Sequence, residues 1–389
     1  MTKTSDKDTN LEALNHTQRA YAGKLFPTEQ IETFRNIDRM FPTRIIERGG
    51  TVKPLQKHQK PILDLPISSN GQTYDLFDYV ARNRVTGLLM LKDSKIALEQ
   101  YEYGNTASTR WMSMSMAKSI STTLVGAAIQ DGFIHSVNDP LTAYIPKLIS
   151  TSYDGVSIKE LLQMTSGVEW NEDQTNPNSE RRKVLDLQIA QEPGAIVNFM
   201  AALPRVAKPG TRFNYSTGET HMVGALLKAA TGKNLADYLS RRIWSKLGME
   251  SDATWWLEAP GGLEIAGSGI SATLRDYARF AMFIMDGGLI DGERILPEGW
   301  VEEATTPRMI DGALVNYGYM WWPLPAQEGL NHSPGFSARG IFGQYIYINP
   351  EEKIVLVVWS ARAKPVHSEV IPDNDFFLAA VKALNALYT

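Results

Sequence analysis

The chain contains no cysteine, which excludes disulfide bonds, a cysteine nucleophile and thiolate metal sites. Its charge is nearly balanced, with 39 Lys and Arg against 43 Asp and Glu, which argues against nucleic acid or an acidic membrane surface as a partner. No segment approaches the roughly 20 consecutive apolar residues that a membrane span needs. The pattern His-x-x-x-His is also absent, so we expect neither a metal nor another cofactor.

The first 30 residues are polar and lack the apolar segment of a secretory signal. We therefore expect a soluble, cytoplasmic protein, with a periplasmic location as the alternative if a leader has been removed. The length of 389 residues, with 43% hydrophobic residues, indicates a globular protein of two domains, or of one domain with a large insertion. The oligomeric state is undetermined, and a homodimer is left open.

Strand signals lie near both ends of the chain, and helical signals fill the middle. Residues 85–91 and 96–101 predict a β-hairpin, and residues 345–348 and 354–359 predict its partner strands. Apolar residues at helical spacing predict helices over residues 116–129, 156–164, 219–231, 237–247, 274–285 and 373–387. The polar stretch 171–182 is expected to be a surface loop over the site.

This arrangement predicts an α+β fold, an antiparallel β-sheet flanked by helices with an all-helical insertion domain. Residues 1–70 are then an N-terminal extension packed on the core. Residues 71–130 and 265–389 form the sheet domain, and residues 131–264 form the mainly helical one. We expect the active site between the two.

Ser115 and Lys118 form a Ser-x-x-Lys pattern at the start of a predicted helix. A serine at a helix N-terminus lies near free backbone N–H groups, and a lysine three residues later lies on the same face. Burial disfavours the ammonium form, which makes Lys118 a candidate proton acceptor for a nucleophilic Ser115. The alternative is a serine that caps the helix beside a lysine whose amine extends to solvent.

Two further segments offer groups for the same chemistry. Tyr215 follows a Pro-Gly turn and precedes a predicted helix; near a lysine its phenol can act as a phenolate base or a proton shuttle, and the alternative is simple packing. Gly340 lies on a glycine-rich strand edge, where backbone N–H groups can form an oxyanion hole. The alternative there is a β-bulge.

The histidines raise the alternative of a Ser-His-Asp triad. His221, His332 and His367 are three of the six in the chain. No Gly-x-Ser-x-Gly elbow occurs, and none of the three lies in a recognisable motif. We therefore expect them to be surface residues.

In chain order, the Ser115–Lys118 pair, Tyr215 and the Gly340 strand resemble the motifs Ser-x-x-Lys, Tyr-x-Asn and Lys-Thr-Gly of the serine β-lactamase and penicillin-binding protein superfamily. The resemblance runs from about residue 70 to the end and is strongest to the class C-like branch. That branch includes family VIII carboxylesterases and the 6-aminohexanoate-dimer (nylon-oligomer) hydrolases. Further matching segments are residues 139–146, 157–167, 266–273 and 340–344.

The resemblance implies a β-lactamase/DD-peptidase-like fold and a role for each motif residue. Ser115 is acylated, Lys118 accepts its proton, and Tyr215 passes a proton to the leaving group. The amides of Ser115 and Ile341 form the oxyanion hole. The expected substrate contacts are Trp170, which falls where nylon-oligomer hydrolases carry a tyrosine, and Thr217, Gly340 and Gln344.

Two departures from the family pattern restrict the substrate. Thr217 stands where β-lactamases carry asparagine, and Ala338-Arg339-Gly340 contains no lysine to anchor the carboxylate of a β-lactam, although Arg339 could stand in as a cation. We therefore predict a serine hydrolase that forms an acyl-enzyme and acts on small linear amides or esters. The alternatives are an acyltransferase, a weak β-lactamase or DD-peptidase, and a non-catalytic penicillin-binding-like sensor.

Overall fold

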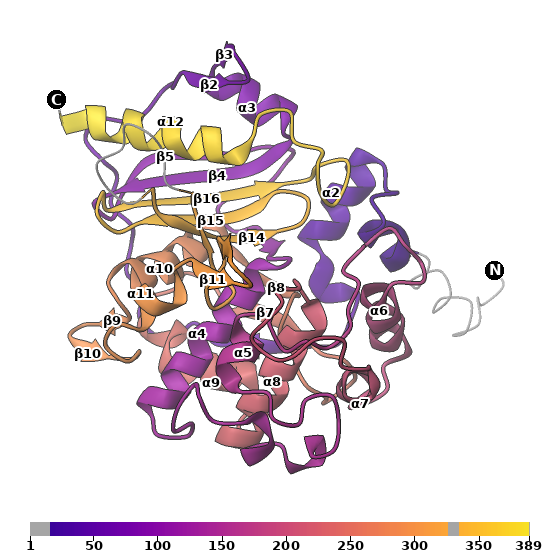
Figure 1. The fold of residues 1–389 in the computed structure, drawn as a ribbon. Helices are drawn as coiled ribbons and strands as arrows, with labels where there is room; N and C mark the ends of the chain where they lie inside the picture. Colours follow the sequence, from indigo (N-terminus) through magenta and orange to yellow (C-terminus); the bar gives the residue numbers. More distant parts are fainter. Residues whose placement is uncertain (1–15, 326–333, 389) are drawn as a thin grey trace, which may run out of the picture.

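The computed structural model describes residues 16–325 and 334–388. Its main sheet has six antiparallel strands in the order β13-β14-β15-β16-β4-β5 (Figure 1). The strands are β4 (Val85–Lys92), β5 (Lys95–Tyr101), β13 (Trp322–Pro323), β14 (Phe336–Gly340), β15 (Gln344–Asn349) and β16 (Ile354–Ser360). The predicted hairpin is therefore confirmed, and β16 pairs with β4 to join the two ends of the chain.

The central strands β4 and β16 are buried along their whole length, because helices cover both faces of the sheet. Side chains alternate between the faces. Leu88 and Leu356 pack into one core, beneath α12 (Asp373–Asn385) and α3 (Leu76–Arg82), while Leu89 belongs to the other. Figure 1 shows α12 along one face of the sheet and α10 (Leu274–Met285) and α11 (Trp300–Ala304) on the opposite side. The predicted α+β class is confirmed.

Away from the sheet, the core that contains Leu89 is built mainly from helices. Its helices are α4 (Met116–Gln130), α5 (Ile158–Leu162), α6 (Glu180–Ala190), α7 (Ala195–Ala202), α8 (Thr217–Thr231) and α9 (Leu235–Arg242). The helix predicted over 237–247 divides into α9 and a 3₁₀ turn, Trp244–Lys246. The prediction of a loop through residue 182 is wrong at its end, because the Ser179 hydroxyl accepts from the Arg182 N–H and caps α6 there.

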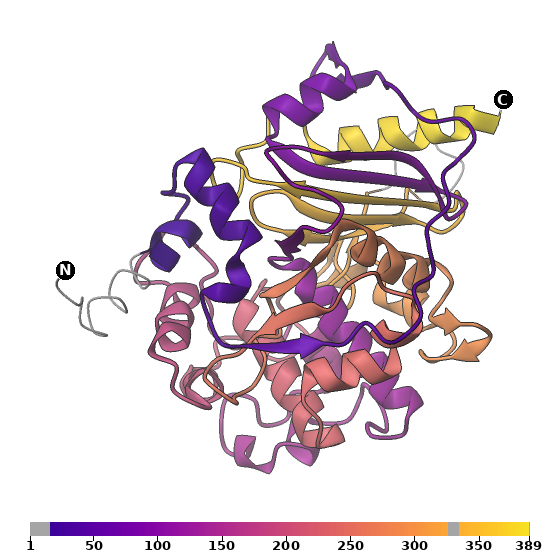
Figure 2. The same cartoon turned by 180° about the vertical axis from the view of Figure 1, so that it is seen from behind.

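A second, four-stranded sheet has the order β1-β7-β8-β6. Its strands are β1 (Thr43–Ile46), β6 (Arg110–Met112), β7 (Ala253–Trp256) and β8 (Ile270–Thr273). Figure 2 shows β1, in indigo, crossing the back of the molecule. The remaining elements are α2 (Pro27–Arg35), the hairpins β2–β3 (Ile67–Ser69, Gln72–Tyr74), β9–β10 (Leu289–Ile290, Glu293–Arg294) and β11–β12 (Arg308–Ile310, Ala313–Val315), and the 3₁₀ turns Ile37–Arg39, Leu141–Ala143, Pro146–Leu148 and Ala386–Tyr388.

The described part of the N-terminal segment, from residue 16 onward, is packed into the body of the protein. Tyr21 is buried, and its hydroxyl lies 3.2 Å from the Ser268 hydroxyl. The segment thus reaches Ser268, and both Tyr21 and Ser268 line a narrow space together with Ser115. Among the described residues, no helix is both long and apolar enough to cross a bilayer.

Candidate active site

Ser115 lies at the start of α4, directly after the short strand β6. Ser113 holds the end of this strand: its N–H donates to the Ile270 carbonyl oxygen at 2.7 Å, and its hydroxyl accepts from the Ile270 N–H at 3.2 Å. Met114, between Ser113 and Ser115, has φ +46°, a left-handed conformation that costs a residue other than glycine about 1–3 kcal/mol. The Ser115 hydroxyl makes no capping bond to α4, so the alternative of a purely capping serine is not supported.

Lys118 lies one turn further along α4 and is 1% exposed. Its Nζ donates to Ser115 Oγ at 2.7 Å, to Thr217 Oγ1 at 3.0 Å and to the Gly267 carbonyl oxygen at 3.2 Å. Burial lowers the pKa of Lys118 from its ordinary 10.5 to about 7, against the opposing charge of Glu172. A neutral amine is therefore well populated near pH 7, and the alternative of a lysine that extends to solvent is wrong.

Tyr215 lies just before α8, beside the same amine. Its ring centroid is 5.1 Å from Lys118 Nζ, and the ring packs against those of Tyr317 and Trp322. Burial raises the pKa of the phenol above its usual value of 10, and the Ser115 side chain lowers it by less. The phenol therefore stays protonated at neutral pH, which favours a proton donor over a phenolate base.

Gly340 brings strand β14 against the turn that precedes the serine. A β-carbon at this position would lie 2.7 Å from the Ser113 carbonyl oxygen and 2.8 Å from Met114 Cβ, so a larger residue would force the two segments apart. Gly340 pairs with Gln344 in the ladder, and Ile341 begins the turn that joins β14 to β15. In the part of the chain that the structure describes, neither the Ser115 nor the Ile341 amide has a hydrogen-bond acceptor.

Glu172 is a site residue that the sequence analysis did not single out. Its Oε1 accepts from the Thr217 hydroxyl at 2.5 Å, and its Oε2 accepts from the Thr217 N–H at 2.8 Å. Thr217 therefore bridges Lys118 and a carboxylate. In the sequence Glu172 is one of several acidic residues of a polar loop, and nothing there distinguishes it from Glu169 or Asp173.

Two predicted substrate contacts face the protein instead. Trp170 is buried, and its indole N–H donates to Glu172 Oε2 at 2.6 Å. Gln344 is fully buried: its Oε1 accepts from the Trp111 indole at 2.9 Å, and its Nε2 donates to the Ser360 carbonyl oxygen at 2.7 Å. Trp170 thus supports Glu172, while Gln344 supports the β14–β15 turn, and neither lines the cavity over Ser115.

A cavity of about 840 Å³ opens over the serine. The residues that line it come from six parts of the chain: Ser115, Glu172–Thr175, Tyr215, Trp322, Arg339–Ile341 with Gly343 and Tyr345, and Arg362 with Lys364–His367 and Glu369. Glu172 and Gly340 belong to this lining, whereas Thr217 lies behind it, in a narrow space of about 10 Å³. Thr217 is therefore placed to act on Lys118 rather than on the substrate.

Arg339 is the most distinctive charge in this cavity. Its guanidinium donates to Ser337 Oγ at 2.8 Å and to Asn374 Oδ1 at 3.0 Å and lies over the Trp322 ring. Within residues 16–325 and 334–388 it forms no salt bridge, and burial lowers its pKa, against the opposing effects of Tyr345 and of the Asp373 charge. Arg339 directly precedes Gly340, and its side chain lines the cavity, a direction that the sequence alone does not determine.

Among the described residues, no histidine forms a hydrogen bond with Ser115. His221 is buried, with its Nε2 3.4 Å from Glu258, so the expectation of a surface residue is wrong there. His367 lies exposed on the rim of the cavity, and His332 falls outside the described residues. No group of acidic residues and histidines suited to a metal occurs among the described residues.

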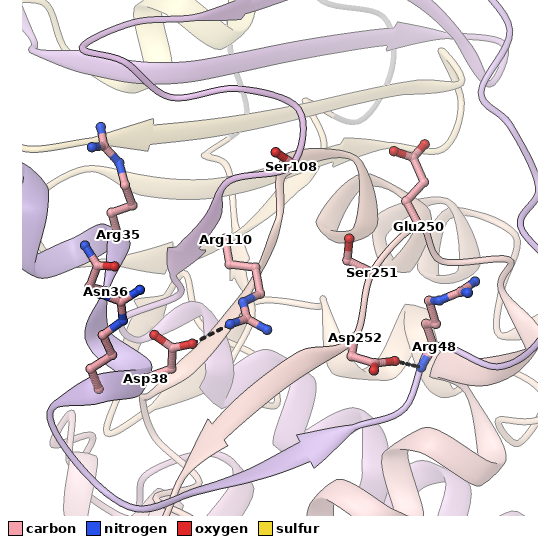
Figure 3. Close-up of a pocket in the computed structure, with 10 residues that line it drawn as sticks. Arg35, Asn36, Asp38, Arg48, Ser108, Arg110, Glu250, Ser251 and Asp252 are labelled. Atoms are coloured by element: carbon pink, nitrogen blue, oxygen red, sulfur yellow. Dashed lines mark hydrogen bonds and ion pairs between the residues drawn. The ribbon is translucent and has the colours of Figure 1, made fainter.

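A second hollow, of about 490 Å³, is lined by four arginines and by Asp38, Glu250 and Asp252 (Figure 3). Arg110 is paired with Asp38, and Asp252 accepts from the Arg48 backbone N–H at 2.8 Å. None of the lining residues is shared with the cavity over Ser115. Its charges largely neutralise one another.

Comparison with known proteins agrees with this geometry. A model of the Beta-lactamase family matches residues 78–379. The chain belongs to the β-lactamase family. It is 28% identical over 347 residues to the 6-aminohexanoate-dimer hydrolase of Paenarthrobacter ureafaciens, covering 85% of each chain. The family is one of hydrolases, and the predicted relationship is confirmed.

Solved structures show the same fold. A Bacillus anthracis protein provisionally named a 6-aminohexanoate-dimer hydrolase superposes with a TM-score of 0.78 at 22% identity, over 92% of this chain and 94% of that one. EstCE1, described as a hydrolase with promiscuous acyltransferase activity, superposes with a TM-score of 0.60 at 14% identity, over 80% and 96%.

Proposed function

We propose that this member of the β-lactamase family is a serine hydrolase that forms an acyl-enzyme on Ser115 and hydrolyses small linear amides or esters. The observation that carries the proposal is the 2.7 Å contact between Lys118 Nζ and Ser115 Oγ at the floor of the cavity. An amine with a pKa of about 7 is matched to proton abstraction near neutral pH.

In the acylation step the Ser115 hydroxyl gives its proton to Lys118, and Oγ forms a bond to the substrate carbonyl carbon. The Ser115 and Ile341 amides, which have no other acceptor among the described residues, stabilise the negative oxygen that develops. The bond to the leaving nitrogen or oxygen then breaks. The Tyr215 phenol protonates that atom, and the proton on Lys118 restores the phenol.

Deacylation repeats this chemistry with water. The water oxygen bonds to the acyl carbon, the bond from that carbon to Ser115 Oγ breaks, and Oγ recovers a proton through Lys118. A substrate with a carboxylate is favoured, because Arg339 presents a cation to the cavity and forms no salt bridge among the described residues. The aminohexanoate-dimer hydrolase relationship supports a linear amide of this kind.

The second candidate is an acyltransferase, in which an alcohol or amine replaces water at the acyl-enzyme. The two reactions share every residue of the acylation step, because they differ only in the acceptor that attacks the acyl-enzyme. The likeness to EstCE1 shows a common fold and does not decide between them. Product analysis with added alcohols and amines separates hydrolysis from transfer.

The test of the proposed function is labelling with a fluorophosphonate, followed by mass mapping of the modified residue. We expect one label per chain, on Ser115, and none in Ser115→Ala. A screen with p-nitrophenyl esters, aminohexanoate oligomers and nitrocefin then identifies the substrate class, and we expect turnover of esters or oligomers without nitrocefin. Stoichiometric labelling elsewhere, with Ser115 untouched, would overturn the proposal.

A further inference from the structure

The general base of the proposed reaction does not stand alone. Lys118 contacts Thr217, and Thr217 contacts Glu172, so a chain of hydrogen bonds runs from the nucleophile to a carboxylate on the loop before α6. The sequence predicts Thr217 as a substrate contact and does not single out Glu172. Their position behind the amine calls for another explanation.

The direction of the hydrogen bonds supplies one. A threonine hydroxyl has one proton to donate, and in Thr217 it is used on Glu172 Oε1 at 2.5 Å. Thr217 Oγ1 can then only accept from Lys118. The Gly267 carbonyl oxygen is likewise an acceptor, at 3.2 Å.

This pattern has a consequence for the neutral amine. A neutral lysine amine has two hydrogens and one lone pair. When both hydrogens are held by Thr217 Oγ1 and the Gly267 carbonyl oxygen, the lone pair is directed at the third neighbour, the Ser115 hydroxyl. That orientation is the one in which Lys118 removes the serine proton.

Glu172 is itself held firmly. The indole N–H of Trp170 donates to Oε2 at 2.6 Å, and the Gln174 amide donates to Oε1 at 3.0 Å. The Arg181 guanidinium lies 3.9 Å away. These donors hold the carboxylate in position.

The charge of Glu172 also favours Lys118 as a proton acceptor. The charged groups that bear on Lys118 are Glu172, which raises its pKa, and Arg181, which lowers it, and the neutral phenol of Tyr215 lies against the amine. Burial alone would lower the pKa further than it does with Glu172 present. The carboxylate thus keeps the lysine basic enough to hold the serine proton.

We propose that Glu172 is a positioning residue for the general base: through the hydroxyl of Thr217 it directs the lone pair of Lys118 at Ser115 and sustains the basicity of the amine. This inference rests on the proposed function. It assigns to the loop before α6 a part in catalysis that does not require contact with substrate.

The test uses the pH dependence of fluorophosphonate labelling of the full-length protein, so no natural substrate is needed. The variants are Glu172→Gln, Thr217→Val and Thr217→Ser. Glu169→Gln is the matched control, since Glu169 lies on the same segment and is exposed. Folding of each variant is checked by its thermal unfolding.

In Glu172→Gln we expect the acid limb of the labelling rate to move to lower pH by about 1 unit, since an opposing charge has been removed from a buried amine. In Thr217→Val the maximal rate should fall at least about tenfold, as expected for a misdirected base. Thr217→Ser, which keeps the hydroxyl, should restore most of that rate. Glu169→Gln should behave as wild type.

Two outcomes overturn the inference while leaving the proposed function intact. One is an acid limb in Glu172→Gln that coincides with the wild-type limb; the other is a Thr217→Val variant that is folded and labels at the wild-type rate. A wild-type protein that is not labelled at Ser115 contradicts the proposed function instead. If Glu172→Gln or Thr217→Val fails to fold, the other variant serves as the test, because each interrupts the hydrogen bonds that run from Lys118 through Thr217 to Glu172.

Discussion

Two ionisable side chains are buried in neighbouring helices, and only one of them contacts a residue that lines the cavity. Burial lowers the pKa of Lys118 on α4 to about 7 and raises that of Glu219 on α8 to about 8. Lys118 contacts the Ser115 hydroxyl. Glu219 accepts from the Ser166 hydroxyl through one oxygen, and among the described residues its other oxygen has no partner.

The comparison shows what a displaced pKa indicates and what it does not. Both shifts have burial as their largest cause, so the shift alone does not mark a catalytic group. What distinguishes Lys118 is its contact with the hydroxyl of Ser115, which lines the cavity, and the acceptors arranged around the amine. Glu219 is expected to be a neutral acid that contributes to the core.

The largest effect should follow from removing the amine. Lys118→Met keeps the length of the side chain and its apolar packing but leaves Ser115 without a base, and we expect the fluorophosphonate labelling rate to fall about 10³-fold. Glu219→Gln, measured in parallel, should label at the wild-type rate. Equal losses in the two variants would remove the distinction between the buried groups.

Tyr215→Phe should give the next largest effect, and the loss should depend on the leaving group. A phenol that protonates the leaving atom matters most for an amide, whose nitrogen leaves poorly without a proton. We expect kcat/KM to fall about 10²-fold or more for amides, and clearly less for p-nitrophenyl esters. A loss of the same size for both substrates would show that Tyr215 acts at another step.

Glu219→Gln should change stability with pH while leaving activity alone. The folded-state pKa of about 8 lies above the unfolded value of 4.5, so the folded protein binds the extra proton, and its stability falls as pH rises from 4.5 through 8. Glutamine removes this dependence. At pH 8 we expect the variant to be more stable by on the order of 2 kcal/mol, measured by urea denaturation. A wild-type protein equally stable at pH 5 and pH 8 would contradict this reasoning.

Much of the fold was accessible from the sequence, because its elements carry strong patterns. The helix predicted over 274–285 is α10, residue for residue, since apolar residues recur at helical spacing and Thr273 caps its start. The hairpin of β4 and β5 follows from its apolar strands and polar turn. By contrast, the strands of the second sheet have only three or four residues each, too few for a periodicity to show.

The candidate site was predictable only in part, and for a physical reason. Ser115, Lys118, Tyr215 and Gly340 belong to local motifs, and the structure brings them together. Glu172 contacts Thr217, which is 45 residues away in the sequence, and no local sequence pattern predicts such a contact. Their roles in catalysis remain predictions, as does the division of the chain into domains.

The most direct test of the central claim is to trap the acyl-enzyme. An ester that the protein hydrolyses is mixed with it, and the reaction is quenched in acid within the first turnover. The peptides are then mapped by mass. We predict the acyl mass on the peptide that contains Ser115, formed at a rate that falls tenfold per pH unit below about 7 as Lys118 becomes an ammonium. Rapid ester turnover with that peptide unmodified at every time point would contradict the account.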